Sequence, residues 1–181
     1  MLSWRVQRLK FLSRAHLKAN PRIGRRAISA ILNAHDECCE TALTGLIFQS
    51  WKIDTIDELV QRANSTAHPD FPRLFAVVLR AADGGDSLAR ALLAEAGSKL
   101  AALAAIVIRR LAQKNSENEF AKTVPSNGIL SVAMTGSVFR QSSEVRQVFC
   151  NVLETGFPGI DVRQEMVEPV DGALARARKM V

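Results

Sequence analysis

The sequence predicts a helix-rich α/β fold formed by one domain. Apolar residues recur at helical spacing through most of residues 24–111, and the chain after Gly128 alternates short apolar strands with helices. A chain of 181 residues has the length of one domain and can bury a core without disulfides or metal ions.

Helical periodicity predicts helices over residues 24–34, 56–63, 69–83 and 87–112, with a polar connector over 35–45. Asp54 or Thr55 suits the N-cap of the second helix, and Asp86 suits that of the fourth. Residues 114–127 are polar and predict a loop. The fourth helix is expected to bury one apolar stripe, and its many alanines would let neighbouring helices approach closely; the stripe consists of Leu92, Ala96, Leu100, Leu103, Val107 and Leu111.

The C-terminal part predicts the order strand, helix, strand, helix. The compact apolar run Ile129–Met134 has the length and composition of a buried parallel strand. A helix capped by Ser142 or Ser143 follows, then a second strand over Gly159–Arg163 and a last helix that begins at Glu168-Pro169.

The positive charge of the chain is concentrated at its N-terminal end. Residues 1–26 hold eight basic residues and no acidic one, whereas the other 155 residues hold 16 basic and 18 acidic residues. A basic arm over residues 1–22 can bind phosphate backbones or an anionic membrane. Because no aromatic ladder or groove-reading motif accompanies the charges, a solvated terminus is favoured and nucleic-acid binding is not expected.

No pattern in the sequence indicates a membrane span or export. The longest unbroken apolar run, Leu100–Ile108, is far shorter than the roughly 20 residues that a membrane helix needs. The first residues lack the apolar core and cleavage site of a secretory signal. Cys38, Cys39 and Cys150 cannot make an even disulfide framework, which fits a reducing compartment. The chain is therefore expected to be cytoplasmic, with no membrane partner.

Two clusters contain possible metal ligands, and each has a simpler interpretation. The run from His35 to Glu40 consists of metal-binding side-chain types, but its adjacent cysteines lack the spacing of a structural zinc site, so an acidic connector is favoured. Asp83 and Asp86 flank two glycines and could hold magnesium, but helix capping is favoured. No metal-ligating residue is assigned from these patterns.

The most informative feature is the glycine turn that follows the strand over Ile129–Met134. Small residues at the carboxyl end of a parallel strand let the backbone lie against a ligand, and a helix start offers unpaired N–H groups. Thr135-Gly136-Ser137-Val138 has this composition. A glycine after a buried strand also occurs where the chain simply turns, so the residues alone leave both interpretations open.

Six short segments occur in a definite order along residues 22–178: Ile23–Ala27, Thr41–Thr44, Ala81–Ala89, Glu95–Gly97, Gly136–Arg140 and Glu168–Ala173. Together they resemble the C-terminal half of the N-acetylglucosamine kinase family, also called the BadF/BadG/BcrA/BcrD-type ATPases. Members of that family are similar to actin and hexokinase, with two ribonuclease-H-like lobes that close on ATP and magnesium. The resemblance implies that residues 23–181 form the C-terminal lobe, with an incomplete sheet.

The resemblance also implies a nucleotide site, but it does not include the phosphate-binding, sugar-binding and catalytic parts of the family's enzymes. Gly136, Ser137 and Val138 would lie against the adenosine of ATP, with Mg²⁺ as the metal cofactor. The family's two phosphate loops, its sugar-binding region and its catalytic base lie outside the similarity. No catalytic residue is therefore assigned, and the substrate-binding residues stay unknown.

This reasoning predicts a truncated ATP-dependent amino-sugar kinase that is inactive alone. Its expected partners are a second copy of itself or a complementary N-terminal half, because a lobe with few strands exposes sheet edges. The alternative is a non-catalytic binding or scaffold module whose basic arm binds a polyanion.

Overall fold

The computed structural model describes residues 22–65, 69–117, 130–168, 170 and 177–178. These residues form two compact units, one ending at Ala96 and the other beginning at Gly97. Helices predominate, and the described strands form a two-stranded parallel sheet. The predicted helix-rich α/β class is therefore confirmed at this level.

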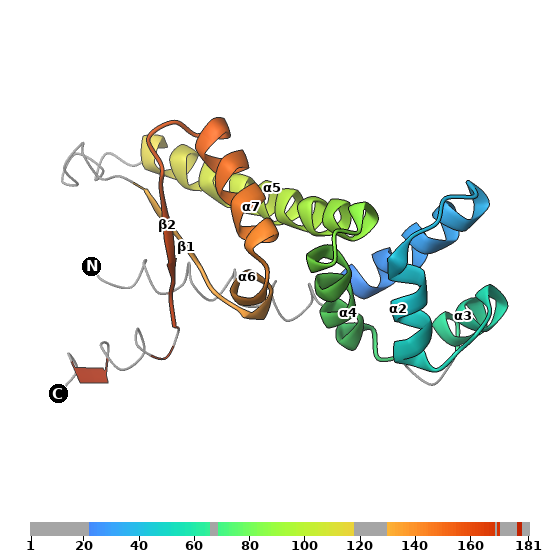
Figure 1. The fold of residues 1–181 in the computed structure, drawn as a ribbon. Helices are drawn as coiled ribbons and strands as arrows, with labels where there is room; N and C mark the ends of the chain where they lie inside the picture. Colours follow the sequence, from blue (N-terminus) through green and yellow to red (C-terminus); the bar gives the residue numbers. More distant parts are fainter. Residues whose placement is uncertain (1–21, 66–68, 118–129, 169, 171–176, 179–181) are drawn as a thin grey trace. The chain divides into compact units, whose positions relative to one another are not determined.

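The unit that ends at Ala96 contains helices and their connectors, with no strand among its described residues. It contains a helix over residues 22–36, then α2 (Ala42–Trp51), α3 (Ile56–Ala63), α4 (Phe71–Asp83) and the first turns of α5 (Ser87–Glu117) (Figure 1). Helices α2 and α4 pack against each other. The largest fully buried side chains of this core are Phe75, Ile31, Leu43, Ile47, Leu59, Leu74, Leu93 and Val78.

Helices α3 and α4 follow the prediction because their caps are local. The Thr55 hydroxyl accepts a hydrogen bond from the backbone N–H of Glu58 at 3.2 Å. The Asp70 carboxylate accepts one from the backbone N–H of Arg73 at 3.3 Å. Each cap satisfies an N–H group that has no partner within its own helix.

The predicted connector over residues 35–45 is shorter in the structure, and this prediction was wrong at both ends. The preceding helix continues to residue 36, and α2 begins at Ala42. Thr41 is the N-cap of α2, so Thr44 and Gly45 lie inside the helix. Glycine weakens a helix by only about 1 kcal/mol, which the buried Leu43 and Ile47 offset.

Gly24 brings two helices into backbone contact. A Cβ atom at Gly24 would lie 2.3 Å from the carbonyl oxygen of Phe71, the first residue of α4. The Phe71 ring is held by two further contacts: Arg25 stacks over it at 4.8 Å, and Trp51 meets it edge to face at 5.9 Å. Only glycine allows this approach, so the position has a structural role.

The unit that begins at Gly97 contains the rest of α5, β1 (Ser131–Met134), α6 (Ser137–Gln141), α7 (Ser143–Gly156) and β2 (Asp161–Met166). The strands are parallel, with Ser131 opposite Asp161, and the chain crosses between them through α6 and α7. Helix α7 packs against α6 and β2 (Figure 1).

The strand boundaries differ from the prediction, although both strands exist. Within the described residues β1 begins at Ser131, and β2 occupies Asp161–Met166 rather than Gly159–Arg163. The short helix α6 was not predicted, because its five residues are fewer than a hydrophobic period needs. The last helix expected from Glu168-Pro169 falls largely outside the described residues, as do residues 1–21 and most of the predicted loop over 114–127.

The expected buried stripe of α5 was also wrong in its second half. Leu103 is 45% exposed, whereas Ala101, Ala104, Ala105 and Ile108 are buried. Residues 114–117, predicted to be loop, belong to the helix. The small residues face inward because α5 lies very close to α7 near Gly97, where a Cβ atom would be 2.8 Å from the carbonyl oxygen of Val145.

Helix α5 also has the length and composition of a membrane span over Ser87–Leu111. The unbroken apolar run inside it is short, but alanines and glycine keep its average hydropathy high. A core helix of a soluble protein meets the same description, so the cytoplasmic location stays a prediction.

Candidate functional site

The candidate site is the turn between β1 and α6. Gly136 has φ +105° and ψ 165°, a conformation that residues with a side chain rarely adopt. It is the N-cap of α6, and its carbonyl oxygen accepts a hydrogen bond from the backbone N–H of Arg140 at 3.1 Å. Thr135, which precedes it, is buried. The glycine therefore turns the chain sharply at the carboxyl end of a parallel strand.

The three predicted nucleotide-binding residues lie together at this turn but differ in exposure. Gly136 is half-buried and Ser137 is exposed. Val138 is 1% exposed, so a ligand could reach its backbone but not its side chain. Phe139 packs edge to face on Phe149 of α7 at 4.9 Å. Val138 and Phe139 thus anchor the turn in the core, and Ser137 lies on the surface.

The start of α6 has no side-chain cap in the described structure. A helix start normally leaves backbone N–H groups without helical partners, and an uncapped one can donate them to a ligand oxygen. Because α6 has only five residues, its helix dipole is small. Hydrogen bonds from the backbone N–H groups would therefore contribute more to holding a ligand oxygen than the dipole does.

Two arginines lie close to the turn along the chain. The Arg146 guanidinium donates to the carbonyl oxygens of Phe139 and Arg140, which satisfies the end of α6. Arg140 forms an exposed ion pair with Glu168. The sequence patterns did not single out Arg146, because an arginine in the first turn of α7 has no local signal for contacts made to another helix.

Cys150 of α7 is buried in the same unit. Burial raises the pKa of its thiol, the nearby Glu154 carboxylate raises it further, and Arg146 partly opposes both. A thiol whose pKa is raised is a weak nucleophile, so Cys150 is a core residue.

Asp86, one of the two aspartates considered as magnesium ligands, is engaged in capping. Its carboxylate accepts hydrogen bonds from the Thr41 hydroxyl at 2.6 Å and from the backbone N–H groups of Leu43 at 3.3 Å and Ala89 at 2.8 Å. Partial burial raises the pKa of Asp86, but bonds from Thr41, Ala89, Leu43 and Ala42 outweigh burial and hold the pKa below its usual 3.8.

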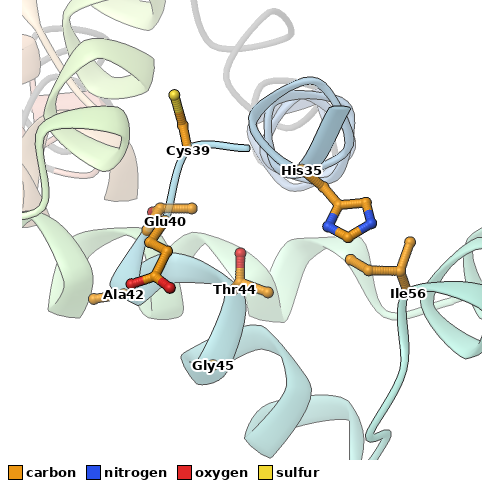
Figure 2. Close-up of a pocket in the computed structure, with 8 residues that line it drawn as sticks. His35, Cys39, Glu40, Ala42, Thr44, Gly45 and Ile56 are labelled. Carbon is orange, nitrogen blue, oxygen red and sulfur yellow. The ribbon is translucent and has the colours of Figure 1, made fainter. Parts of the chain in front are cut away.

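The run from His35 to Glu40, the other possible set of metal ligands, borders a shallow hollow of about 510 Å³. In Figure 2 the Cys39 side chain points away from the His35 ring, and the Glu40 carboxylate lies toward Ala42 and Thr44 instead. Cys38 and Cys39 are exposed. Across the described residues no group of three or more His, Cys, Asp or Glu side chains gathers in a way that would hold a metal ion.

The six segments of the family resemblance contact one another in pairs. Arg26 of the first segment bonds Glu95 of the fourth at 3.1 Å. Thr41 of the second bonds Asp86 of the third, and Arg140 of the fifth bonds Glu168 of the sixth. Each of the six segments is therefore joined to one other by a side-chain contact.

Two basic residues that directly follow the basic arm make contacts within the chain. Arg25 stacks on Phe71 and Arg26 pairs with Glu95, while residues 1–21 lie outside the described part. These contacts give Arg25 and Arg26 a structural role in the helical unit.

No protein-family model matches this chain, and no curated protein is similar to it in sequence.

Proposed function

We propose that the chain is the adenosine-binding C-terminal lobe of a sugar-kinase-like ATPase of the N-acetylglucosamine kinase type. One observation carries the proposal: a glycine with positive φ ends a parallel strand and opens a helix that no side chain caps. Ligands in α/β folds bind at the carboxyl ends of parallel strands, where such helix starts meet them. The paired contacts among the six family-like segments support it further.

Within this proposal each residue of the turn has a distinct role. Gly136 has no side chain, so the nucleotide can lie directly against its backbone. The exposed Ser137 hydroxyl and the first N–H groups of α6 donate to ligand oxygens. Val138 anchors the turn in the core and contributes only its backbone.

The described residues do not fit a magnesium site. Asp86 has its oxygens engaged by Thr41, Leu43 and Ala89, and no other carboxylate cluster is present among the described side chains. We derive no chemical step through magnesium.

The proposal is tested by calorimetric titration of the full chain with ATP, AMP and inorganic phosphate. We expect ATP and AMP to bind with similar affinity and phosphate to bind more weakly, because the family-like contact is to the adenosine. Ser137→Asp should weaken ATP binding about tenfold, since its carboxylate would take up the helix-start N–H groups that the ligand's oxygens need.

Two matched variants separate loss of binding from loss of fold. Ser143→Asp adds the same charge to the exposed first residue of α7 and should leave the affinity unchanged. Gly136→Asp and Gly159→Asp each put a side chain on a residue with positive φ, +105° and +93°, but only the first should abolish binding. Equal ATP affinity in the wild type and Ser137→Asp, or no ATP binding at all, overturns the proposal.

A further inference from the structure

The two-stranded sheet has one covered face and one open face. Val132, Met134 and Val162 are buried on one side, whereas Asp161 and Arg163 are exposed on the other. In the described part of the chain no third strand pairs with β1 or β2. Two strands are marginal alone, and an unpaired edge is a template for another strand.

The outer edge of β2 presents the backbone groups of Val162. The Asp161 N–H donates to the carbonyl oxygen of Leu130 at 3.1 Å, so the backbone of Asp161 faces β1. Because backbone groups alternate in direction along a strand, the N–H and C=O of Val162 face away from β1. Figure 1 shows β2 beside β1, with which it pairs in parallel.

The exposed face carries opposite charges on either side of Val162. The Arg163 Nε atom lies 3.9 Å from the Asp161 Oδ2 atom. The Ser131 hydroxyl donates to Asp161 Oδ2 at 3.1 Å and accepts from Arg163 Nε at 3.0 Å. If two copies of β2 lie antiparallel with Val162 opposite Val162, each Asp161 lies opposite an Arg163. The even segment of β2 holds no other charged residue, so no like charges meet within it. Parallel pairing in register would instead oppose identical charges, which is unfavourable.

The regular part of the sheet is suited to antiparallel pairing of two copies of β2 with Val162 at the centre. The register is even from Ser131 opposite Asp161 to Ala133 opposite Arg163, and it shifts only beyond Ala133. Val162 lies in the middle of the even segment, where hydrogen bonding to a further strand is unobstructed by the shift. An antiparallel pair there would exchange both N–H···O=C bonds between the two Val162 residues.

We propose that the outer edge of β2 is a self-pairing interface: two copies of the chain join β2 to β2, antiparallel about a two-fold axis at Val162. The result is a four-stranded sheet in the order β1, β2, β2, β1, with reciprocal pairs of Asp161 and Arg163 on its open face. The interface does not involve the Gly136 turn, so it is independent of the nucleotide proposal.

Charge reversal tests the proposal by sedimentation velocity and light scattering at micromolar concentration. The wild type should be a dimer. Arg163→Asp and Asp161→Arg should each weaken self-association about tenfold or more, because each places like charges opposite one another. The double variant Asp161→Arg/Arg163→Asp should dimerise again, and Glu154→Arg, on the exposed surface of α7, should dimerise like the wild type.

Mixing the two single variants gives a result that damage to the fold cannot imitate. Asp161→Arg alone and Arg163→Asp alone should be monomeric, and their mixture should form a heterodimer. Val162→Cys in a Cys38→Ser/Cys39→Ser background should also form a disulfide between copies. A monomeric wild type, dimers that persist in both single variants, or a mixture that stays monomeric overturns the proposal and points to another occupant of this edge.

Discussion

Asp86 serves two helix starts with one carboxylate. It caps α5 through the N–H of Ala89 and also accepts from Thr41 and Leu43 at the start of α2. The turn before it is fixed by Gly85, whose φ is +92°, and by a backbone bond from the Asp86 N–H to the carbonyl of Ala81 at 3.0 Å. This arrangement is a glycine C-cap of α4 followed directly by the N-cap of α5.

Replacing the charge at this position should lower stability in a pH-dependent way. Asp86→Asn is expected to reduce the free energy of unfolding by about 1–2 kcal/mol at pH 7, because an amide is uncharged and has one acceptor oxygen, whereas both carboxylate oxygens of Asp86 accept hydrogen bonds. Because the folded pKa of Asp86 lies below its usual 3.8, this stabilisation is fully present above the unfolded pKa and is lost as pH falls through the folded pKa. Urea unfolding of both proteins between pH 7 and pH 3 measures the difference.

Asp83 provides the matched control. It is exposed at the end of α4, where a negative charge gains nothing from the helix dipole. Asp83→Asn should change the unfolding free energy by less than about 0.5 kcal/mol at any pH. An Asp86→Asn effect that stays constant down to pH 3 would contradict the capping role of the charge.

Helices α5 and α7 meet at Gly97, where neither backbone leaves room for a side chain. A Cβ atom there would lie 2.8 Å from the Val145 carbonyl oxygen and 3.0 Å from the Val148 Cβ atom. Because these partners are backbone and a branched side chain, neither can move aside without shifting the helix. The position therefore sets the distance between the two helices.

Alanine should have opposite effects at two helical glycines. Gly97→Ala is expected to destabilise the protein by about 1–3 kcal/mol through overpacking. Gly45→Ala, inside α2, has nothing within 4 Å of its added Cβ and should stabilise by about 0.5–1 kcal/mol through helix propensity. Thermal and urea unfolding of the two variants in parallel would check this, and stabilisation by both would show that α5 and α7 can separate at no cost.

Phosphoryl transfer needs groups that neutralise charge and position both substrates. The described residues supply the turn at Gly136 that we propose for a nucleotide, and no group of three or more metal-ligating side chains gathers among them. Under the proposed function, the groups that move a phosphoryl group would come from a second lobe.

We accordingly expect no sugar-dependent ADP release when the chain is incubated with ATP, magnesium and N-acetylglucosamine or glucosamine. A coupled assay for ADP measures this, with Gly136→Asp as the background. Release above that background would show that this chain completes the reaction without a second half, and would overturn the prediction of inactivity.

The sequence by itself determined the features that depend on neighbouring residues. The helix caps at Thr55 and Ser142 are each one of the two residues that local patterns offered, and α4 ends at the two glycines as predicted. The glycine turn after β1 also lies where the sequence placed it, although the short helix α6 that begins there was not predicted. Each depends on contacts a few residues apart, so the chain carries the information locally.

Tertiary contacts decided the rest, because they join residues that no local pattern relates. Leu103 of α5 faces solvent while Ala101 and Ala104 are buried, since the approach of α7 at Gly97 favours small residues over large ones. The start of α2 depends on Asp86, which lies 45 residues from Thr41. Pairing with β1 sets the bounds of β2. The register of that pairing, rather than the composition of residues 159–166, selects Asp161–Met166 as the strand.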